Sequence, residues 1–285
     1  MKINDVFETQ TRRKEVQFDK EKFFRNCATA IEQYKNGVVL YRGLKKPKDS
    51  LTYSDSTKSV RASAFAKSNQ YTIWVDNHPS WKDFPKRSRS FICSTNYHTA
   101  RHFGIPHIVF PIGDPKFGIC PVSDFQLSFP YAYKNYNFGV LSLNNQISSL
   151  VDQYSEKIYH TYDELLKALA ELQKRYDDLK DRGLIKAWLS KEPKKQEQAF
   201  DLMSPEERRF THQLVDPNSN GGIFQVNHSI FDSLSYALDP YKNGFKIEDF
   251  SEMKFLDNKE VWFSGKAYFV SMKSELYQTL KNELR

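Results

Sequence analysis

Apolar residues recur at helical spacing near the N-terminus of the chain. Between residues 19 and 34 they stand three or four positions apart, at Phe24, Cys27, Ile31 and Tyr34. The spacing predicts helical structure, which Asn36-Gly37 ends.

The clearest helical pattern lies in the middle of the chain. It opens at the capping sequence Thr161-Tyr162-Asp163-Glu164 and ends before Gly183. Its apolar stripe alternates spacings of four and three, at Leu165, Leu169, Leu172, Tyr176 and Leu179. The stripe packs onto its own domain, forms a helical hairpin or binds a partner. Another helix opens at Ser204-Pro205-Glu206-Glu207.

Short β-rich runs lie on both sides of this helical region, at 38–41, 91–94, 107–110, 261–263 and 267–270. The last two flank Ser264-Gly265, which predicts a β-hairpin. Residues 45–90 are polar and contain breakers, so we expect them to be irregular. After residue 94, Thr95 or Asn96 caps a short helix that carries Ala100 and Phe103 on one face and is closed by Gly104. Together these patterns predict an α+β fold rather than alternating βαβ units.

Composition narrows the class of protein. The 285 residues include 22 Phe, 16 Tyr and 4 Trp, so we expect a core built around aromatic rings. The net charge of +7 allows an acidic partner without requiring one. No apolar run approaches the roughly 20 residues of a membrane helix, and no secretory signal is evident. Three widely spaced cysteines, Cys27, Cys93 and Cys120, favour reduced thiols and a cytoplasmic protein.

Three segments combine a predicted strand with an unusual polar side chain. They are Tyr41-Arg42-Gly43, Ser94-Thr95-Asn96, and Glu260 at the start of Glu260-Val261-Trp262-Phe263. Taken singly, each has an ordinary explanation: a salt-bridging arginine, a helix cap and a solvated carboxylate.

In this order, the three segments resemble the mono-ADP-ribosyltransferase family, in its branch with an Arg, Ser-Thr-Ser, Glu signature and in its bacterial or phage effector type. The similarity covers two blocks, near 38–125 and 223–271. It implies a split, mostly antiparallel β-core of ADP-ribosyltransferase type, with N-terminal helices and a helical insertion. The implied activity moves ADP-ribose from NAD to a macromolecular acceptor, protein or nucleic acid, and releases nicotinamide.

The resemblance also implies roles for single residues. Glu260 stabilises the oxocarbenium character of the ribose, as in glycoside hydrolysis, and Arg42 binds the pyrophosphate. Gly43 brings backbone groups to the nicotinamide amide. Ser94 holds the glutamate and the ribose, and Thr95 supports the strand end. Phe103 or Tyr97 shields the nicotinamide, and the sequence does not choose between them.

The chain departs from the family pattern in two ways. Asn258 stands two residues before Glu260, where the family has glutamate or glutamine to help select the acceptor, so an arginine acceptor is not expected. Ser94 and Glu260 are also 260 − 94 = 166 positions apart, more than a minimal transferase needs. We therefore expect four parts: an N-terminal helical segment (1–37), the first half of the β-core (38–144), a helical insertion or accessory lobe (145–215), and a second half with the catalytic hairpin and a C-terminal helix (216–285).

Two other classes of function remain. A metal site is one of them: five candidate ligands fall within 28 residues, namely Cys93, His98, His102, His107 and Cys120. No compact metal-binding motif accompanies them, and we expect no metal.

The non-enzymatic alternative is a nucleic-acid- or protein-binding effector on a degenerate transferase fold, because positive charge with many aromatics suits stacking and phosphate contacts. Turnover of NAD separates an enzyme from a binding module.

Overall fold

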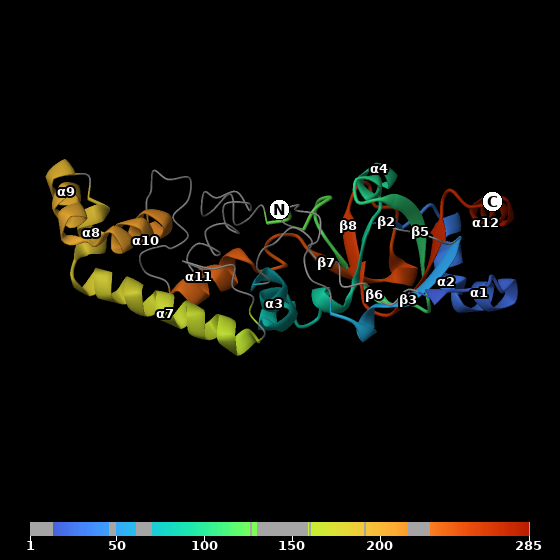
Figure 1. Ribbon diagram of the computed structural model, residues 1–285, viewed down its shortest axis with the longest axis horizontal. Helices are drawn as coiled ribbons and strands as arrows, with labels where there is room; N and C mark the ends of the chain where they lie inside the picture. The colour runs from blue at the N-terminus through green and yellow to red at the C-terminus, as the bar shows by residue number, and fades with distance from the viewer. Residues whose placement is uncertain are drawn as a thin grey trace. The chain divides into compact units, whose positions relative to one another are not determined.

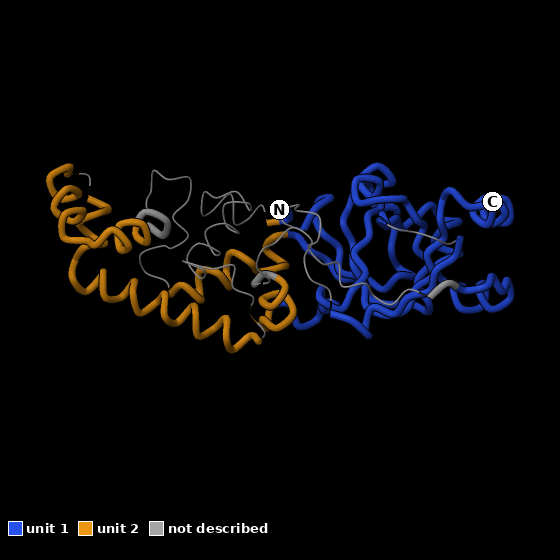
Figure 2. The backbone as a smooth tube through the Cα atoms, viewed as in Figure 1, with its two compact units in different colours: residues 1–65, 81–128, 244–285 blue, residues 66–80, 129–243 orange. Residues whose placement is uncertain are grey.

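The computed structural model describes residues 14–45, 50–60, 70–125, 127–129, 159, 161–190, 192–215 and 229–284. The chain divides into two compact units (Figure 2). The first comprises Met1–Phe65, Trp81–Ser128 and Gly244–Arg285, and the second Ala66–Ser80 and Phe129–Asn243. The predicted boundary at 144/145 and the loop 216–222 lie outside the described residues.

The first unit is built on an antiparallel β-sheet (Figure 1). Nine strands of the described segments form it, in the order β1-β3-β9-β5-β2-β4-β8-β6-β7. Their bounds are Lys14–Glu15 (β1), Tyr41–Leu44 (β2), Leu51–Asp55 (β3), Phe91–Ser94 (β4), Ile105–Pro111 (β5), Lys116–Ile119 (β6), Lys246–Asp249 (β7), Glu260–Phe263 (β8) and Lys266–Ser271 (β9). With the helices around it, this sheet confirms the prediction of an α+β protein.

Helices and short 3-10 turns complete the first unit. The α-helices are α1 (Lys20–Asn26), α2 (Ala28–Lys35), α4 (Tyr97–Arg101) and α12 (Glu275–Glu283). The 3-10 turns are η1 (Ser56–Lys58), η3 (Arg87–Arg89) and η4 (Phe250–Glu252), and η2 (Pro79–Trp81) joins the two units along the chain.

The N-terminal helices predicted from the helical spacing over 19–34 are confirmed, and they are two, α1 and α2. The chain breaks at Cys27, which ends α1 and precedes α2. The carbonyl of Asn26 accepts a hydrogen bond from the N–H of Gly113, which lies in a loop far along the chain. Because that bond binds Asn26 to a neighbouring segment, tertiary structure overrides the helical period. The predicted stop is confirmed, since Asn36 caps α2 and Gly37 follows at φ +85°.

The strand predictions are confirmed at 91–94 and 107–110, which form β4 and part of β5. The strand predicted over 38–41 lies three residues later, at β2. Val38 and Leu40 are apolar because they are buried in the core, whereas backbone pairing with β5 starts at Tyr41. The region 45–90 is also less irregular than predicted, because β3 pairs with β1 and β9 within it.

The β-hairpin predicted around Ser264-Gly265 is wrong, although both of its strands exist. In the sheet, β8 pairs with β4 and β6, and β9 pairs with β3 and β5. Four steps of strand order separate β8 from β9, about 19 Å in a flat sheet. Since two linking residues span at most about 10 Å, the sheet must fold back on itself. The ring of Phe91 on β4 accordingly lies 5.1 Å from that of Phe269 on β9.

The second unit is helical in the residues described. Its helices are α3 (Gln70–Asn77), α7 (Tyr162–Asp181), α8 (Leu184–Trp188), α9 (Pro193–Leu202), α10 (Pro205–Val215) and α11 (Ile230–Ala237). The helix predicted after Thr161 is confirmed: Thr161 caps α7, and all five residues of the apolar stripe are buried. The helix predicted at Ser204 is confirmed as α10.

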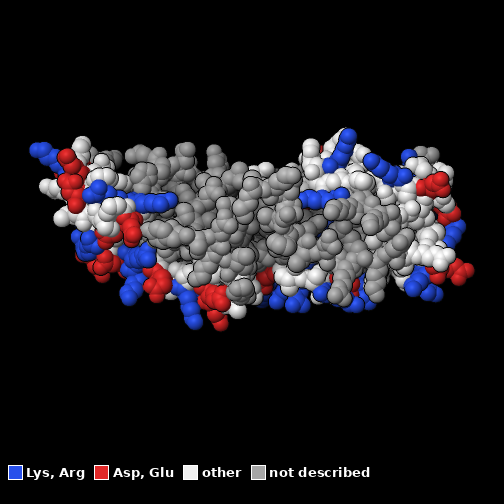
Figure 3. All heavy atoms as spheres, viewed as in Figure 1, with Lys and Arg blue, Asp and Glu red and all other residues white. Residues whose placement is uncertain are grey.

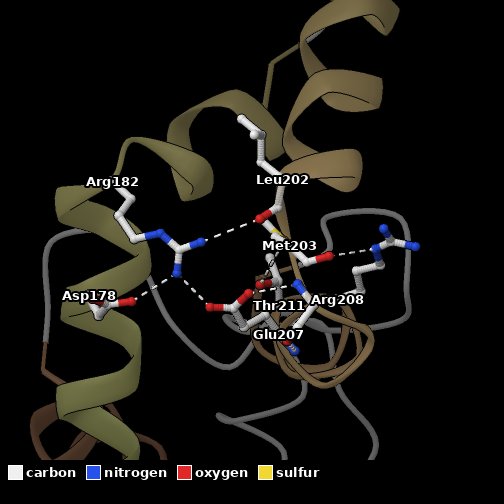
Figure 4. A network of polar contacts seen from close by, with 8 residues as sticks. Asp178, Arg182, Leu202, Met203, Glu207, Arg208 and Thr211 are labelled. Carbon is white, nitrogen blue, oxygen red and sulfur yellow. Dashed lines mark hydrogen bonds and ion pairs between the residues drawn. The ribbon is translucent and has the colours of Figure 1, made fainter.

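A polar network joins the end of α7 to α10 (Figure 4). Arg182 bonds Asp178 on its own helix and Glu207 on α10, and its second nitrogen donates to the carbonyl of Leu202. Ser204 and Glu207 also exchange hydrogen bonds, each backbone N–H donating to the other side chain, which is a capping box. The network therefore ties the start of α10 to the end of α7 across the intervening helices α8 and α9.

Candidate functional site

Three neighbouring strands bring the predicted site segments into one row. Tyr41 on β2 pairs with Ser94 on β4, and Ser94 pairs with Glu260 on β8. Two strand spacings amount to about 10 Å, so segments that are 53 (94 − 41) and 166 (260 − 94) positions apart in sequence meet here. Residues directly opposed in a sheet project from the same face, which places the side chains of Ser94 and Glu260 side by side.

Arg42 lies where two strands of the row separate. The backbones of β2 and β4 pair at Tyr41 and Ser94, and that is the one register position recorded between these two described strands. Next to it, Nη1 of Arg42 donates to the carbonyl of Ile92 at 2.8 Å, and its guanidinium lies 6.0 Å from the ring of Phe91. The side chain of Arg42 thus supplies a hydrogen bond between β2 and β4 where their backbones separate.

The end of β4 is tied to β8 through Thr95 and Lys259. The N–H of Thr95 donates to the carbonyl of Lys259, and the N–H of Lys259 donates to Oγ1 of Thr95 at 2.8 Å. The buried hydroxyl of Ser94 accepts from the N–H of Asn96, and the side chain of Asn96 caps α4. Of the two predicted caps, Asn96 is therefore the one used, and Thr95 fastens the strand end.

Gly43 is required by the packing of α4 on β2. A Cβ on Gly43 would lie 2.2 Å from the carbonyl oxygen of Ala100 and 2.8 Å from the nitrogen of Gly104. The glycine therefore lets helix and strand backbones approach, and its predicted contact with nicotinamide stays a prediction.

The two aromatic candidates differ in exposure. Tyr97 is half-buried and packs edge-on against Tyr41, with centroids 6.0 Å apart. Phe103 lies beyond the end of α4 and is 50% exposed, whereas Ala100 is buried. Shielding of a nicotinamide by either ring stays a prediction.

Glu260 is held by Arg87, from a basic cluster for which the sequence suggests only attraction of an anionic ligand or a solvated loop, not a carboxylate partner. Oε1 of Glu260 lies 2.5 Å from Nη2 of Arg87, and Oε2 accepts from the N–H of Phe125 at 3.3 Å. The side chains of Arg87 and Glu260 are 11% and 14% exposed. In sequence, Arg87 was one of three cations in Lys86-Arg87-Ser88-Arg89, and nothing local distinguished it from Arg89.

Asn258 adopts a left-handed backbone conformation two residues before Glu260, with φ +45°. Its Oδ1 accepts from the hydroxyl of Thr99 on α4 at 3.1 Å. Asparagine tolerates this conformation better than most residues, so the residue suits its backbone position.

Burial disfavours the thiolate form of the two cysteines near the row. Burial raises the pKa of Cys93 to about 12; Arg42 acts to lower it and Glu260 to raise it. Burial also raises the pKa of Cys120 well above its usual value, with Glu260 acting in the same direction and Arg87 against it. Among the described residues, no group of three His, Cys, Asp or Glu side chains is placed to hold a metal ion.

Two further results bear on the class of protein. Within the described part of the chain, no helix combines the length and apolar character needed to span a bilayer. Comparison of the chain with protein-family models, with curated proteins and with solved structures gives no match.

Proposed function

We propose that this protein is an NAD-dependent mono-ADP-ribosyltransferase of effector type. The observation that carries the proposal is the row on β2, β4 and β8, where Ser94 directly opposes Glu260 and Arg42 lies next to Tyr41. Segments this far apart in sequence have no local reason to meet, and their convergence is what one nucleotide-binding site requires.

The chemistry of the row suits cleavage of the bond between nicotinamide and ribose. Positive charge develops on the ribose as that bond breaks, and the carboxylate of Glu260 would stabilise it. The hydroxyl of Ser94 accepts from Asn96 and retains a proton to donate to the ribose or to Glu260. A guanidinium carries five N–H donors, so Arg42 can bind pyrophosphate oxygens while one nitrogen bonds Ile92.

The fold supports the same proposal. The strands β2 and β4 share one register position, at Tyr41 and Ser94, so the antiparallel sheet is least tightly paired beside Arg42. We propose that this is the split core of an ADP-ribosyltransferase, with NAD entering where the two strands diverge. The acceptor would be a macromolecule, protein or nucleic acid, in the cytoplasm, where the free thiols of Cys27, Cys93 and Cys120 would stay reduced.

One observation favours a second candidate, a binding protein on a degenerate transferase fold. Both carboxylate oxygens of Glu260 already have partners within the chain, Arg87 and the N–H of Phe125. An ion pair of this kind also occurs as a purely structural contact, and Glu260 would then have no role toward a ribose. The protein would then bind nucleic acid or protein without consuming NAD.

Release of nicotinamide from NAD separates the two candidates. We expect the purified protein to release nicotinamide slowly without acceptor, and to transfer label from NAD to protein or RNA in a cell extract. Glu260→Gln keeps the shape of the side chain but loses its charge, so transfer should fall on the order of 10²-fold or more with the fold intact. Arg42→Lys should mainly raise the KM for NAD, because lysine lacks paired donors.

The outcome against the enzyme is equally clear. If the wild-type protein and Glu260→Gln release nicotinamide at the same background rate, the transferase proposal fails and the binding protein stands.

A further inference from the structure

We propose that Arg87 is the positioning residue for Glu260: it fixes the carboxylate that serves the ribose without itself touching NAD. This inference rests on the proposed transferase function. Arg87 lies outside the three segments that carry the proposed function.

The carboxylate of Glu260 is fixed at both ends. Arg87 holds Oε1 and the N–H of Phe125 holds Oε2, so rotation about the last torsion of the side chain would break one of the two contacts. A carboxylate has about four lone-pair sites, and two contacts leave sites for substrate hydroxyls. The position of the group is thereby set without exhausting its capacity to accept.

Arg87 is itself held in place, by an aromatic cradle. Its guanidinium lies 3.9 Å from the ring of Phe125 and 5.3 Å from that of Trp262. Trp262 is fully buried, and its indole N–H donates to the carbonyl of Pro85, just before the arginine in the chain. Stacking of a guanidinium on aromatic faces fixes its plane as well as its charge.

The backbone that carries Arg87 is fastened from three directions. The hydroxyl of Ser90 donates to the carbonyl of Lys86, and the carbonyl of Arg89 accepts from the hydroxyls of Ser56 and Ser264. Both the arginine and its 3-10 turn are therefore rigid before any ligand arrives.

This rigidity matters because glutamate is a flexible side chain. Ordering a free glutamate on binding costs rotamer entropy, and a reacting group displaced by about 1 Å loses roughly 10²-fold in rate. Arg87 and the rings around it order the side chain of Glu260 when the protein folds, so this entropy is not lost when NAD binds. Arg87 then affects the rate only through Glu260, and this predicts a distinct kinetic pattern.

The test compares nicotinamide release by four proteins: wild type, Arg87→Met, Glu260→Gln and the double variant. We expect Arg87→Met to lower kcat about tenfold to a hundredfold while leaving the KM for NAD within about twofold, because the arginine does not touch NAD. In the Glu260→Gln background the same change should have no further effect, since the group that it positions is gone. Added guanidinium ion should partly restore kcat in Arg87→Met and not in the double variant.

Matched variants separate positioning from folding. Arg89→Met alters an exposed arginine of the same 3-10 turn and should keep wild-type kinetics. If Arg87→Met does not fold, Phe125→Leu takes its place, because it removes the ring under Arg87 but keeps the N–H that bonds Glu260. This variant should show the same loss of kcat at unchanged KM.

Three results would overturn the assignment: wild-type kcat in Arg87→Met, a loss confined to KM, or an equal loss with and without Glu260. With an active wild type, these results refute Arg87 alone. A wild-type protein that releases no nicotinamide refutes the transferase function, and the role of Arg87 falls with it.

Discussion

At the scale of single residues, close approach of backbones decides which side chains the site can contain. Gly43 and Gly118 both lie on strands where a Cβ would collide with a neighbour. At Gly43 the neighbour is the backbone carbonyl of Ala100, and at Gly118 it is the ring of Trp262, each 2.2 Å away. The absence of a Cβ at Gly43 thus lets α4 pack on β2, and its absence at Gly118 leaves room for the indole of Trp262, which faces Arg87.

Gly43→Ala should therefore destabilise the protein strongly. A backbone carbonyl cannot rotate aside as a side chain can, so we expect a loss of roughly 3 kcal/mol, at the upper end of overpacking costs. Urea unfolding measures it. The comparison is Gly113→Ala, which has open space but φ +78° and should cost about 1 kcal/mol through backbone strain alone. Equal losses in the two variants would mean that α4 shifts to admit the methyl group.

At the scale of elements, the junction of α7 with α10 depends on one carboxylate. Partial burial alone would raise the pKa of Glu207, but hydrogen bonds from the N–H of Ser204 and from Arg182 outweigh it and hold that pKa below its usual 4.5. A carboxyl with a depressed pKa in the folded protein stabilises it above the unfolded value. That stabilisation disappears as the pH falls through the folded pKa.

Glu207→Gln should accordingly cost stability at neutral pH and little in acid. Urea unfolding at pH 7 and near pH 3 checks this, and the difference between wild type and variant should shrink as the pH falls. Glu206→Gln is a suitable control, because Glu206 lies beside Glu207 in the first turn of α10. A difference that stays constant with pH would show that Glu207 acts by packing rather than by charge.

How far an element can be predicted depends on where its partners lie. The pattern of α7 is local: a cap at Thr161 and five apolar positions identify it, and both features hold in the structure. The link Ser264-Gly265 carries an equally good local signal for a hairpin, yet β8 and β9 pair with strands more than 140 positions away. Pairing at that distance is decided by packing, which a turn signal does not contain.

The same distinction explains the candidate site. Its three segments were found because each has its own sequence motif. Arg87 has none: its role depends on Glu260, 173 positions later, and on the rings of Phe125 and Trp262. A cation that pairs with a distant carboxylate looks in sequence like any other cation in a basic loop.

At the scale of the whole molecule, charge is mixed rather than gathered by sign over the helical unit. On the face in Figure 3, Lys and Arg side chains are interspersed with Asp and Glu over the described helices of the second unit. Salt bridges such as that of Lys195 with Glu192 add to this mixture. Recognition of an acceptor there would rest on particular residues rather than on a broad field.

We predict that the polar face of α7 recognises the acceptor. Lys174 and Lys180 are exposed on it, so Lys174→Glu with Lys180→Glu should reduce transfer to the natural acceptor. Hydrolysis of NAD without acceptor should stay unchanged, because exposed substitutions usually cost under about 0.5 kcal/mol. Lys82→Glu with Lys266→Glu makes the same change in charge on the first unit and should leave both activities as they are. If transfer and hydrolysis fall together, or neither changes, α7 is a structural helix.

The pairing of β3 with β9 has a consequence for the newly made chain. Leu51 pairs with Val270, which is 219 positions later, and a ribosome adds roughly 5 to 20 residues per second. After β3 is made, roughly 10 to 45 s therefore pass before β9 is made, and during that time the edge of β3 that β9 will cover can pair with other chains. The helices α7 to α10, which Arg182 joins to residues only 20 and 25 positions later, can form during that wait. Yield in a cell should then depend on the rate of translation and on the supply of chaperones, even where the finished protein is stable.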